Sequence, residues 1–94
     1  MEVLMDKVLM EQNSIQLYPN PAIDEVNVLY NVASDASNTM IEISDVAGRS
    51  IGKYAATTNN NLMKINTQSF KKGVYYVMLV VNGKNCKVEK LVIQ

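Results

Sequence analysis

The sequence has no histidine, no tryptophan and a single cysteine, Cys86. Because histidine is missing, zinc sites with histidine ligands and catalytic triads with a histidine base are excluded. One cysteine can build neither a multi-cysteine zinc site nor an internal disulfide, so we expect a fold that is stable without a covalent cross-link.

The chain also has no excess of charge of either sign: nine lysines and arginines balance nine aspartates and glutamates. A neutral chain lacks the basic face that general nucleic-acid binding needs, so no nucleic-acid partner is expected. The charges are nevertheless uneven, with five acids and one lysine in residues 1–25, and five lysines and one glutamate in residues 71–94. Two interpretations of the basic end stay open: attraction of an acidic partner, or solvated edge lysines that discourage aggregation.

A long hydrophobic run is missing as well. The longest run, residues 74–81, has eight residues, whereas a membrane-spanning helix needs about 20. The first seven residues lack the basic and long apolar regions of a secretory signal peptide. We therefore expect either a cytosolic protein or a piece of a longer chain whose signal lies upstream.

What the 94 residues do contain is the pattern of one small β domain, with 48% hydrophobic residues for a core. Alternation is clearest over residues 25–32, where Val26, Val28 and Tyr30 share one face. We predict strands over residues 14–18, 25–32, 39–44, 49–56, 62–66, 74–81 and 85–93. This series predicts an all-β fold, an antiparallel immunoglobulin-like sandwich of about seven strands. Residues 74–81, apolar on both faces, are expected to form a central strand.

Turn residues separate the predicted strands. Pro19 and Pro21 have no N–H to donate and end the first strand. The turn at residues 45–49 is expected to place Gly48 at positive φ. Asn82 and Gly83 form the pair that favours a type I′ hairpin between the last two strands.

Residues 1–13 follow a different pattern. Val3, Leu4, Val8 and Leu9 fit a helical stripe of about two turns, which is marginal as an isolated helix. The alternatives for this segment are an interdomain tail, an added strand or an appended sequence.

No cluster of residues predicts catalysis or metal binding. Asp24 and Glu25 are adjacent, so their side chains point to opposite faces of a strand. Asp35, Asn38 and Asp45 have oxygen atoms that calcium accepts as ligands, but their spacing matches no known calcium loop. We therefore expect a protein that is not an enzyme and that needs no cofactor.

Cys86 and the paired tyrosines are interpreted as structural. Cys86 shares a face with Val88, where a small apolar residue fits, and no histidine is present to activate its thiol. Tyr75 and Tyr76 follow two lysines and are candidates for stacking on bases or sugars. Adjacent tyrosines more often place one ring in each layer of a sandwich, and we favour that interpretation.

Five short motifs follow one another in the sequence, at residues 17–22, 43–49, 65–67, 73–77 and 87–93. Their order resembles that of the C-terminal sorting domains of the type IX (Por) secretion system of Bacteroidetes, over residues 15–94. The first strand is expected to be anchored in the core by Tyr18, with the prolines holding the bend that follows. The motif positions that carry the resemblance are Tyr18, Pro19, Asn20, Pro21, Asp45, Gly48, Gly73 and Tyr75.

The resemblance implies delivery rather than catalysis. Residues 15–94 would be the sorting domain and residues 1–14 a linker from an upstream cargo domain. The implied partners are the type IX machinery, namely an outer-membrane shuttle protein and a surface sortase that usually removes the domain. The implied route runs through the periplasm to the outer-membrane surface or the extracellular space.

The last hairpin is the expected recognition element, because an edge strand there would offer backbone groups and positive charge together. Lys87, Lys90 and Val92 are the residues expected to be recognised by the machinery. Open strand edges also allow a homodimer.

The alternative function is an adhesion or carbohydrate-binding module, which needs an exposed aromatic platform. The aromatic residues available for one are Tyr18, Tyr30, Tyr54, Phe70, Tyr75 and Tyr76.

Overall fold

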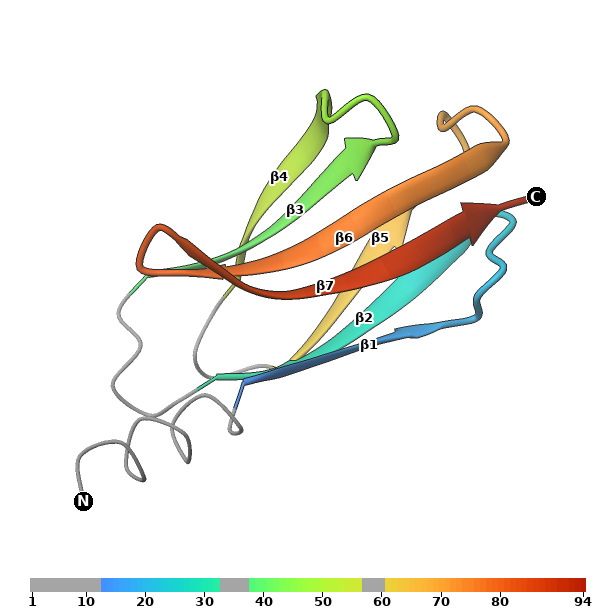
Figure 1. The fold of residues 1–94 in the computed structure, drawn as a ribbon. Coiled ribbons are helices and arrows are strands. Elements are labelled where there is room, and N and C mark those ends of the chain that lie inside the picture. The colour runs from blue at the N-terminus through green and yellow to red at the C-terminus, as the bar shows by residue number, and fades with distance from the viewer. Residues whose placement is uncertain (1–12, 33–37, 57–60) are drawn as a thin grey trace, which may run out of the picture.

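The computed structural model describes residues 13–32, 38–56 and 61–94, and these form seven strands (Figure 1). The predicted helical stripe in residues 1–13 lies outside this part of the chain, apart from its last residue, and so does most of the loop at 34–38. None of the described residues belongs to a helix long and apolar enough to span a membrane. The strands are β1 Ser14–Tyr18, β2 Glu25–Asn31, β3 Thr39–Asp45, β4 Ser50–Ala56, β5 Leu62–Asn66, β6 Gly73–Val81 and β7 Lys84–Ile93.

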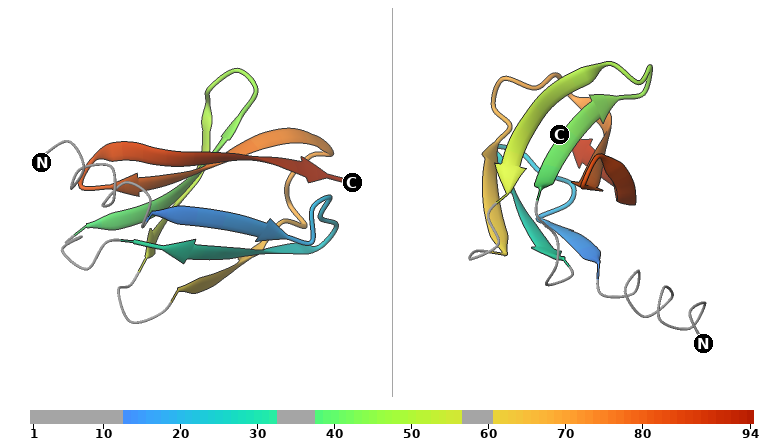
Figure 2. Two further views of the ribbon diagram at one scale, coloured as in Figure 1. Left: turned by 60° about the horizontal axis from the view of Figure 1, so that its bottom comes forward. Right: turned by 90° about the vertical axis from the view of Figure 1, so that its left-hand side faces the viewer.

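The strands form two antiparallel sheets that pack face to face (Figure 2). One sheet has the order β1-β2-β5 and the other has the order β4-β3-β6-β7. The predicted immunoglobulin-like sandwich is therefore confirmed. β6 lies between β3 and β7, which confirms the central position expected for the strand that is apolar on both faces.

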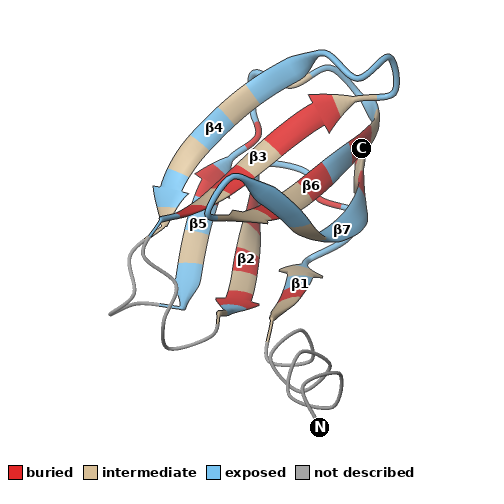
Figure 3. Ribbon diagram, turned by 60° about the vertical axis from the view of Figure 1, so that its left-hand side comes forward, coloured by how far each residue is buried: buried red, intermediate tan, exposed pale blue. Residues whose placement is uncertain are grey.

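The core lies between the two sheets and follows the alternation in the sequence (Figure 3). Val26, Val28 and Tyr30 of β2 are buried, as predicted from their shared face. They meet a buried row from the larger sheet that includes Ile41 and Leu79. Each fully buried side chain of this size stabilises the fold by about 1.5–3 kcal/mol relative to exposure, so burial of the core is the main favourable contribution to folding.

Two tight turns have the backbone that their sequences require. Gly48 has a φ of 85° in the β3–β4 turn, where its N–H donates to the Asp45 carbonyl over 3.0 Å. Asn82 and Gly83 have φ values of 51° and 82° between β6 and β7. Positive φ at both positions is the requirement of a type I′ hairpin, so this prediction is confirmed.

The prediction that Tyr18 anchors β1 in the core is wrong, because its side chain is 46% exposed. Ile15 is buried and Leu17 packs against the core, so the period-two alternation turns Tyr18 outward. The strand is anchored by Ile15 and Leu17 instead. Tyr75 and Tyr76 do separate as expected, with Tyr75 buried and Tyr76 37% exposed on the outer face.

Candidate recognition surface on the last strand

The last strand, β7, lies at the edge of the four-stranded sheet and pairs only with β6. An edge strand leaves one row of backbone N–H and C=O groups without a strand partner, and such a row is a ready template for binding another chain. The condition set for recognition by the last hairpin, that one of its strands is an edge, is therefore met. What covers each part of that edge decides which part is accessible.

Asn20 covers the carboxyl half of the edge with its side-chain amide. Its Nδ2 donates to the Lys90 carbonyl over 2.8 Å, and its Oδ1 accepts from the Val92 N–H over 3.0 Å. One amide thus supplies the donor and the acceptor that a neighbouring strand would supply. The two flanking peptide bonds, Tyr18–Pro19 and Asn20–Pro21, are cis.

The backbone of Ala22 continues this cover. Its N–H donates to the Val92 carbonyl and its carbonyl accepts from the Gln94 N–H, both over 2.8 Å. Ala22 forms a parallel bridge with Ile93 and is completely buried. The Pro-Asn-Pro loop therefore closes the β7 edge from Lys90 onward.

The amino half of the edge, Lys84–Val88, is open in the sense that no strand is hydrogen-bonded to it among the described residues, although β1 runs alongside β7 (Figure 1). The Lys90 carbonyl and the Val92 N–H point away from β6, toward the loop. Because this orientation alternates along a strand, the N–H and carbonyl of Val88 also point away from β6. Within the described residues, no hydrogen bond from outside β6 and β7 reaches this stretch. A register shift at Leu79/Val80 also interrupts its pairing with β6, next to the half-buried Cys86. The open part of the edge is therefore short, irregular and flanked by β1.

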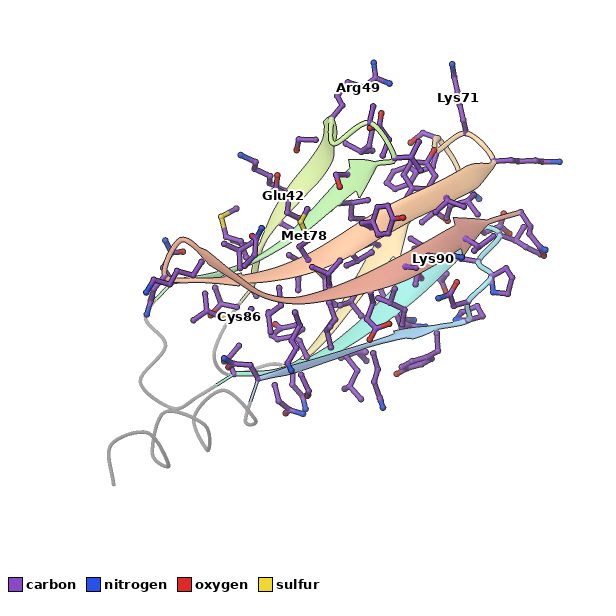
Figure 4. The ribbon with its side chains drawn as sticks, in the orientation of Figure 1. Glu42, Arg49, Lys71, Met78, Cys86 and Lys90 are labelled. Atoms are coloured by element: carbon purple, nitrogen blue, oxygen red, sulfur yellow. The ribbon has the colours of Figure 1, made fainter. Side chains whose placement is uncertain are left out.

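Charged side chains line this edge. Lys84, Lys87, Glu89 and Lys90 are all exposed, and Val88 is 53% exposed. Lys87 pairs with Leu79 of β6, so the two side chains lie on the same, core-facing side of the sheet. Leu79 is buried there, whereas Lys87 is exposed to solvent. Charges placed in a core-facing row of an edge strand disfavour uncontrolled pairing with further strands. Figure 4 shows the position of Lys90 and Cys86 on β7.

The other motif residues gather at the end of the sandwich where β7 finishes. Gly73 pairs with Ile93, and Tyr75 pairs with both Leu91 and Asp45, which starts the turn that contains Gly48. The Pro-Asn-Pro loop reaches the same end through its bridge to Ile93. Residues spread over much of the sequence are thus brought together at this end, whereas Lys87 lies nearer the start of β7.

The carboxylate of Asp45 is held by several bonds within the β3–β4 turn. Its Oδ1 accepts from the N–H groups of Arg49 and Ala47 over 2.9 and 3.0 Å, and its Oδ2 lies 3.1 Å from Arg49 Nε. The Arg49 backbone N–H is the main cause of a lowered pKa at Asp45, and the Ala47 N–H and the guanidinium act in the same direction. These bonds stabilise the turn.

Neither a metal cluster nor a platform of exposed tyrosines is found in the part of the chain that the structure describes. No group of three or more His, Cys, Asp or Glu side chains there is arranged to hold a metal ion. The clearly exposed tyrosines, Tyr18 and Tyr76, lie on different sheets, so they do not form one stacking surface. No observation therefore favours the carbohydrate-binding alternative.

Comparison with known proteins decides the family. The family described as secretion system C-terminal sorting domain matches residues 16–94. The chain belongs to this family. The resemblance inferred from the ordered motifs is thus confirmed, and a sorting role in type IX secretion, with export toward the outer membrane or cell surface, follows from membership.

One solved structure shows the same fold. The crystal structure of dimeric latent PorU from Porphyromonas gingivalis matches with a TM-score of 0.66 and 18% identity. The match covers 86% of this chain and 9% of PorU, so this sorting domain corresponds to a small part of that protein. No curated protein sequence matches significantly.

The sequence did not reveal the role of the Asn20 side chain. Its flanking prolines indicated a bend, but its partners Lys90 and Val92 lie 70 and 72 residues away. The one available signal was an amide, with both a donor and an acceptor, held between two residues that lack an N–H.

Proposed function

We propose that this chain is a non-catalytic signal that directs an upstream cargo domain across the outer membrane through the type IX secretion system. In this proposal the cargo passes through the periplasm, a shuttle protein and a surface sortase engage the domain, and the sortase cleaves within or just before residues 1–14. Family membership over residues 16–94 is the observation that supports it most directly. The match to a small part of the much longer PorU is consistent with a module carried by a larger protein.

We assign recognition to the open stretch of β7 and its lysines. Lys87 lies on the uncovered half of the edge, and the Lys90 side chain is exposed where that half ends. Val92 is half-buried and its backbone is bonded to Asn20 and Ala22, so in this proposal it holds the strand in place. An extended segment of the receptor can then add to this stretch by backbone pairing where it displaces β1, with acidic side chains opposite the lysines.

A reporter fusion in a bacterium with a type IX system tests the role. A reporter with a periplasmic signal peptide is joined to the full 94-residue chain, and its distribution between periplasm and surface is measured by cell fractionation. The double variant Lys87→Glu with Lys90→Glu is expected to accumulate in the periplasm. Lys64→Glu, an exposed lysine on β5, is the matched control and is expected to be exported normally.

The outcomes separate the role from the assigned surface. If the reporter reaches the surface as well after deletion of residues 87–94 as with the complete domain, the sorting role is refuted. If the deletion variant accumulates in the periplasm but the double charge-reversal variant is exported normally, the sorting role stands and the β7 assignment is refuted. Circular dichroism must show a folded domain for each point variant, because deletion of residues 87–94 also removes the buried Leu91 and Ile93.

N-terminal sequencing of the released domain tests the cleavage position. A new N-terminus at or before Ser14 is expected, because cleavage there leaves every strand of the sandwich intact. A new N-terminus inside β1 or β2 would contradict this part of the proposal.

A further inference from the structure

An open cleft of about 570 Å³ lies between the β3–β4 turn and the β5–β6 loop. Both segments stand at the upper end of the sandwich in Figure 1, away from the open half of β7. The turn contributes Val46 and Arg49, and the loop contributes Phe70, Lys71 and Lys72. The sorting role described above makes no use of this cleft.

The floor of the cleft is apolar and firmly held. The rings of Phe70 and Tyr75 lie 5.4 Å apart between centroids, tilted at 45°. The Tyr75 hydroxyl donates to the Lys71 carbonyl over 2.6 Å, which fixes the loop against the core. Two further apolar lining residues, Val46 and Ile51, are 71% and 37% exposed. Large apolar side chains exposed around one concavity are a feature of surfaces that bind partners.

The rim of the cleft is positively charged. Arg49 uses its Nε to bind Asp45, and its side chain remains 79% exposed. Neither Nη group hydrogen-bonds to a described residue, so the guanidinium is oriented and still has donors for a second carboxylate. Lys71 and Lys72 are exposed across the cleft. Figure 4 shows Arg49 and Lys71 both projecting from this end of the molecule.

Asp45 offsets one positive charge of the rim, because its carboxylate is ion-paired with Arg49. It also accepts from two backbone N–H groups, so most of its acceptor capacity is used within the turn. Among the described residues that line the cleft, Asp45 is the only acidic one. An occupant therefore meets three cations and one carboxylate, a net charge of 3 − 1 = +2.

We propose that this cleft binds an acidic peptide segment of a partner protein, with an apolar side chain on the Phe70–Tyr75 floor and carboxylates at Arg49 and Lys72. Charge complementarity selects carboxylates, and the apolar floor selects a peptide side chain over a free anion. The open shape suits a surface segment, because small-molecule sites enclose most of their ligand. This proposal does not rest on the sorting role, since the β7 edge takes no part in it.

Titration of the ¹⁵N-labelled 94-residue chain by NMR tests the proposal. The probe is the peptide acetyl-Glu-Leu-Asp-Phe-Glu-amide, and its neutral match is acetyl-Gln-Leu-Asn-Phe-Gln-amide. Saturable shift changes are expected at the amides of Val46, Arg49, Phe70 and Lys72. Since ion pairs between exposed groups are screened by water, the acidic peptide should bind about fivefold more tightly than the neutral one.

Variants locate the interaction. Arg49→Gln retains the backbone bonds of the turn and is expected to weaken binding of the acidic peptide about threefold. Val46→Ser removes exposed apolar surface and should weaken both peptides. Lys84→Gln, on β7, is the matched control for a lost positive charge and should leave binding unchanged.

Three results would overturn the proposal. Equal affinity for the acidic and neutral peptides would show that the charged rim plays no part. Shift changes centred on Lys84–Lys90 would place binding on β7. Inorganic phosphate that produces the same saturable changes at the same concentration as the acidic peptide would show a site for an anion only, with no contribution from the apolar floor.

Discussion

Removing the Asn20 side chain should loosen β7 without disturbing the core. Asn20→Ala deletes two hydrogen bonds, at 2.8 and 3.0 Å, that hold Lys90 and Val92. Each such bond contributes a net 0.5–1.5 kcal/mol in typical cases, but Asn20 is exposed and water replaces part of the loss. We expect the free energy of unfolding to fall by about 1–2 kcal/mol, and each kcal/mol lowers the melting temperature by roughly 4–8 °C in a domain of this size.

Urea denaturation and amide hydrogen exchange measure this effect. The Val92 N–H, which donates directly to Asn20, should lose more protection than the amides of β3 and β6. Asn27→Ala is the control, because it removes one exposed side-chain bond, the 3.1 Å contact to the Tyr18 carbonyl. The reasoning is refuted if Asn20→Ala loses no more stability than Asn27→Ala and the Val92 amide keeps its protection.

Two further predictions concern single side chains. The pKa of Asp45 is lower in the folded state than in the unfolded state, where it is about 3.9. The ionised carboxylate therefore stabilises the fold at pH values above 3.9, and this stabilisation is lost as the pH falls through the folded-state pKa. Asp45→Asn should therefore show a smaller drop in melting temperature from pH 6 to pH 2 than the wild type, whereas an equal drop would contradict the linkage; Asp24→Asn is the control. Thr39 Oγ1 is buried with no hydrogen-bond partner among the described residues, so Thr39→Val should raise the free energy of unfolding by about 1 kcal/mol in urea titrations. A loss of stability in Thr39→Val would show that the hydroxyl is satisfied in solution.

The strands were predictable because their patterns are local. Alternation at Val26, Val28 and Tyr30 identifies a half-buried strand without knowledge of its neighbours. Gly48 and the Asn82-Gly83 pair likewise mark turns through backbone conformations that few residues adopt. These signals were sufficient to predict seven strands and the central position of β6.

The sites depend on long-range contacts, which local patterns do not contain. Nothing near Asn20 indicates that its amide binds β7, and nothing near Val46 indicates that Phe70 lies across a cleft. Tyr18 shows a second limit, because its size and its place before Pro19 suggested a core anchor while the alternation of β1 turned it outward. The order of motifs revealed the family, but three-dimensional proximity was needed to find the surfaces.

The bonds between Ala22 and the end of β7 link positions about as far apart as this domain allows. A ribosome makes β7 after the other six strands, so this closure can form only once the whole domain has been synthesised. A polypeptide that stops short would leave β6 exposed as an edge and Asn20 without partners. The arrangement therefore makes closure of the carboxyl half of β7 a late step of folding, which joins the first loop of the described fold to its last strand.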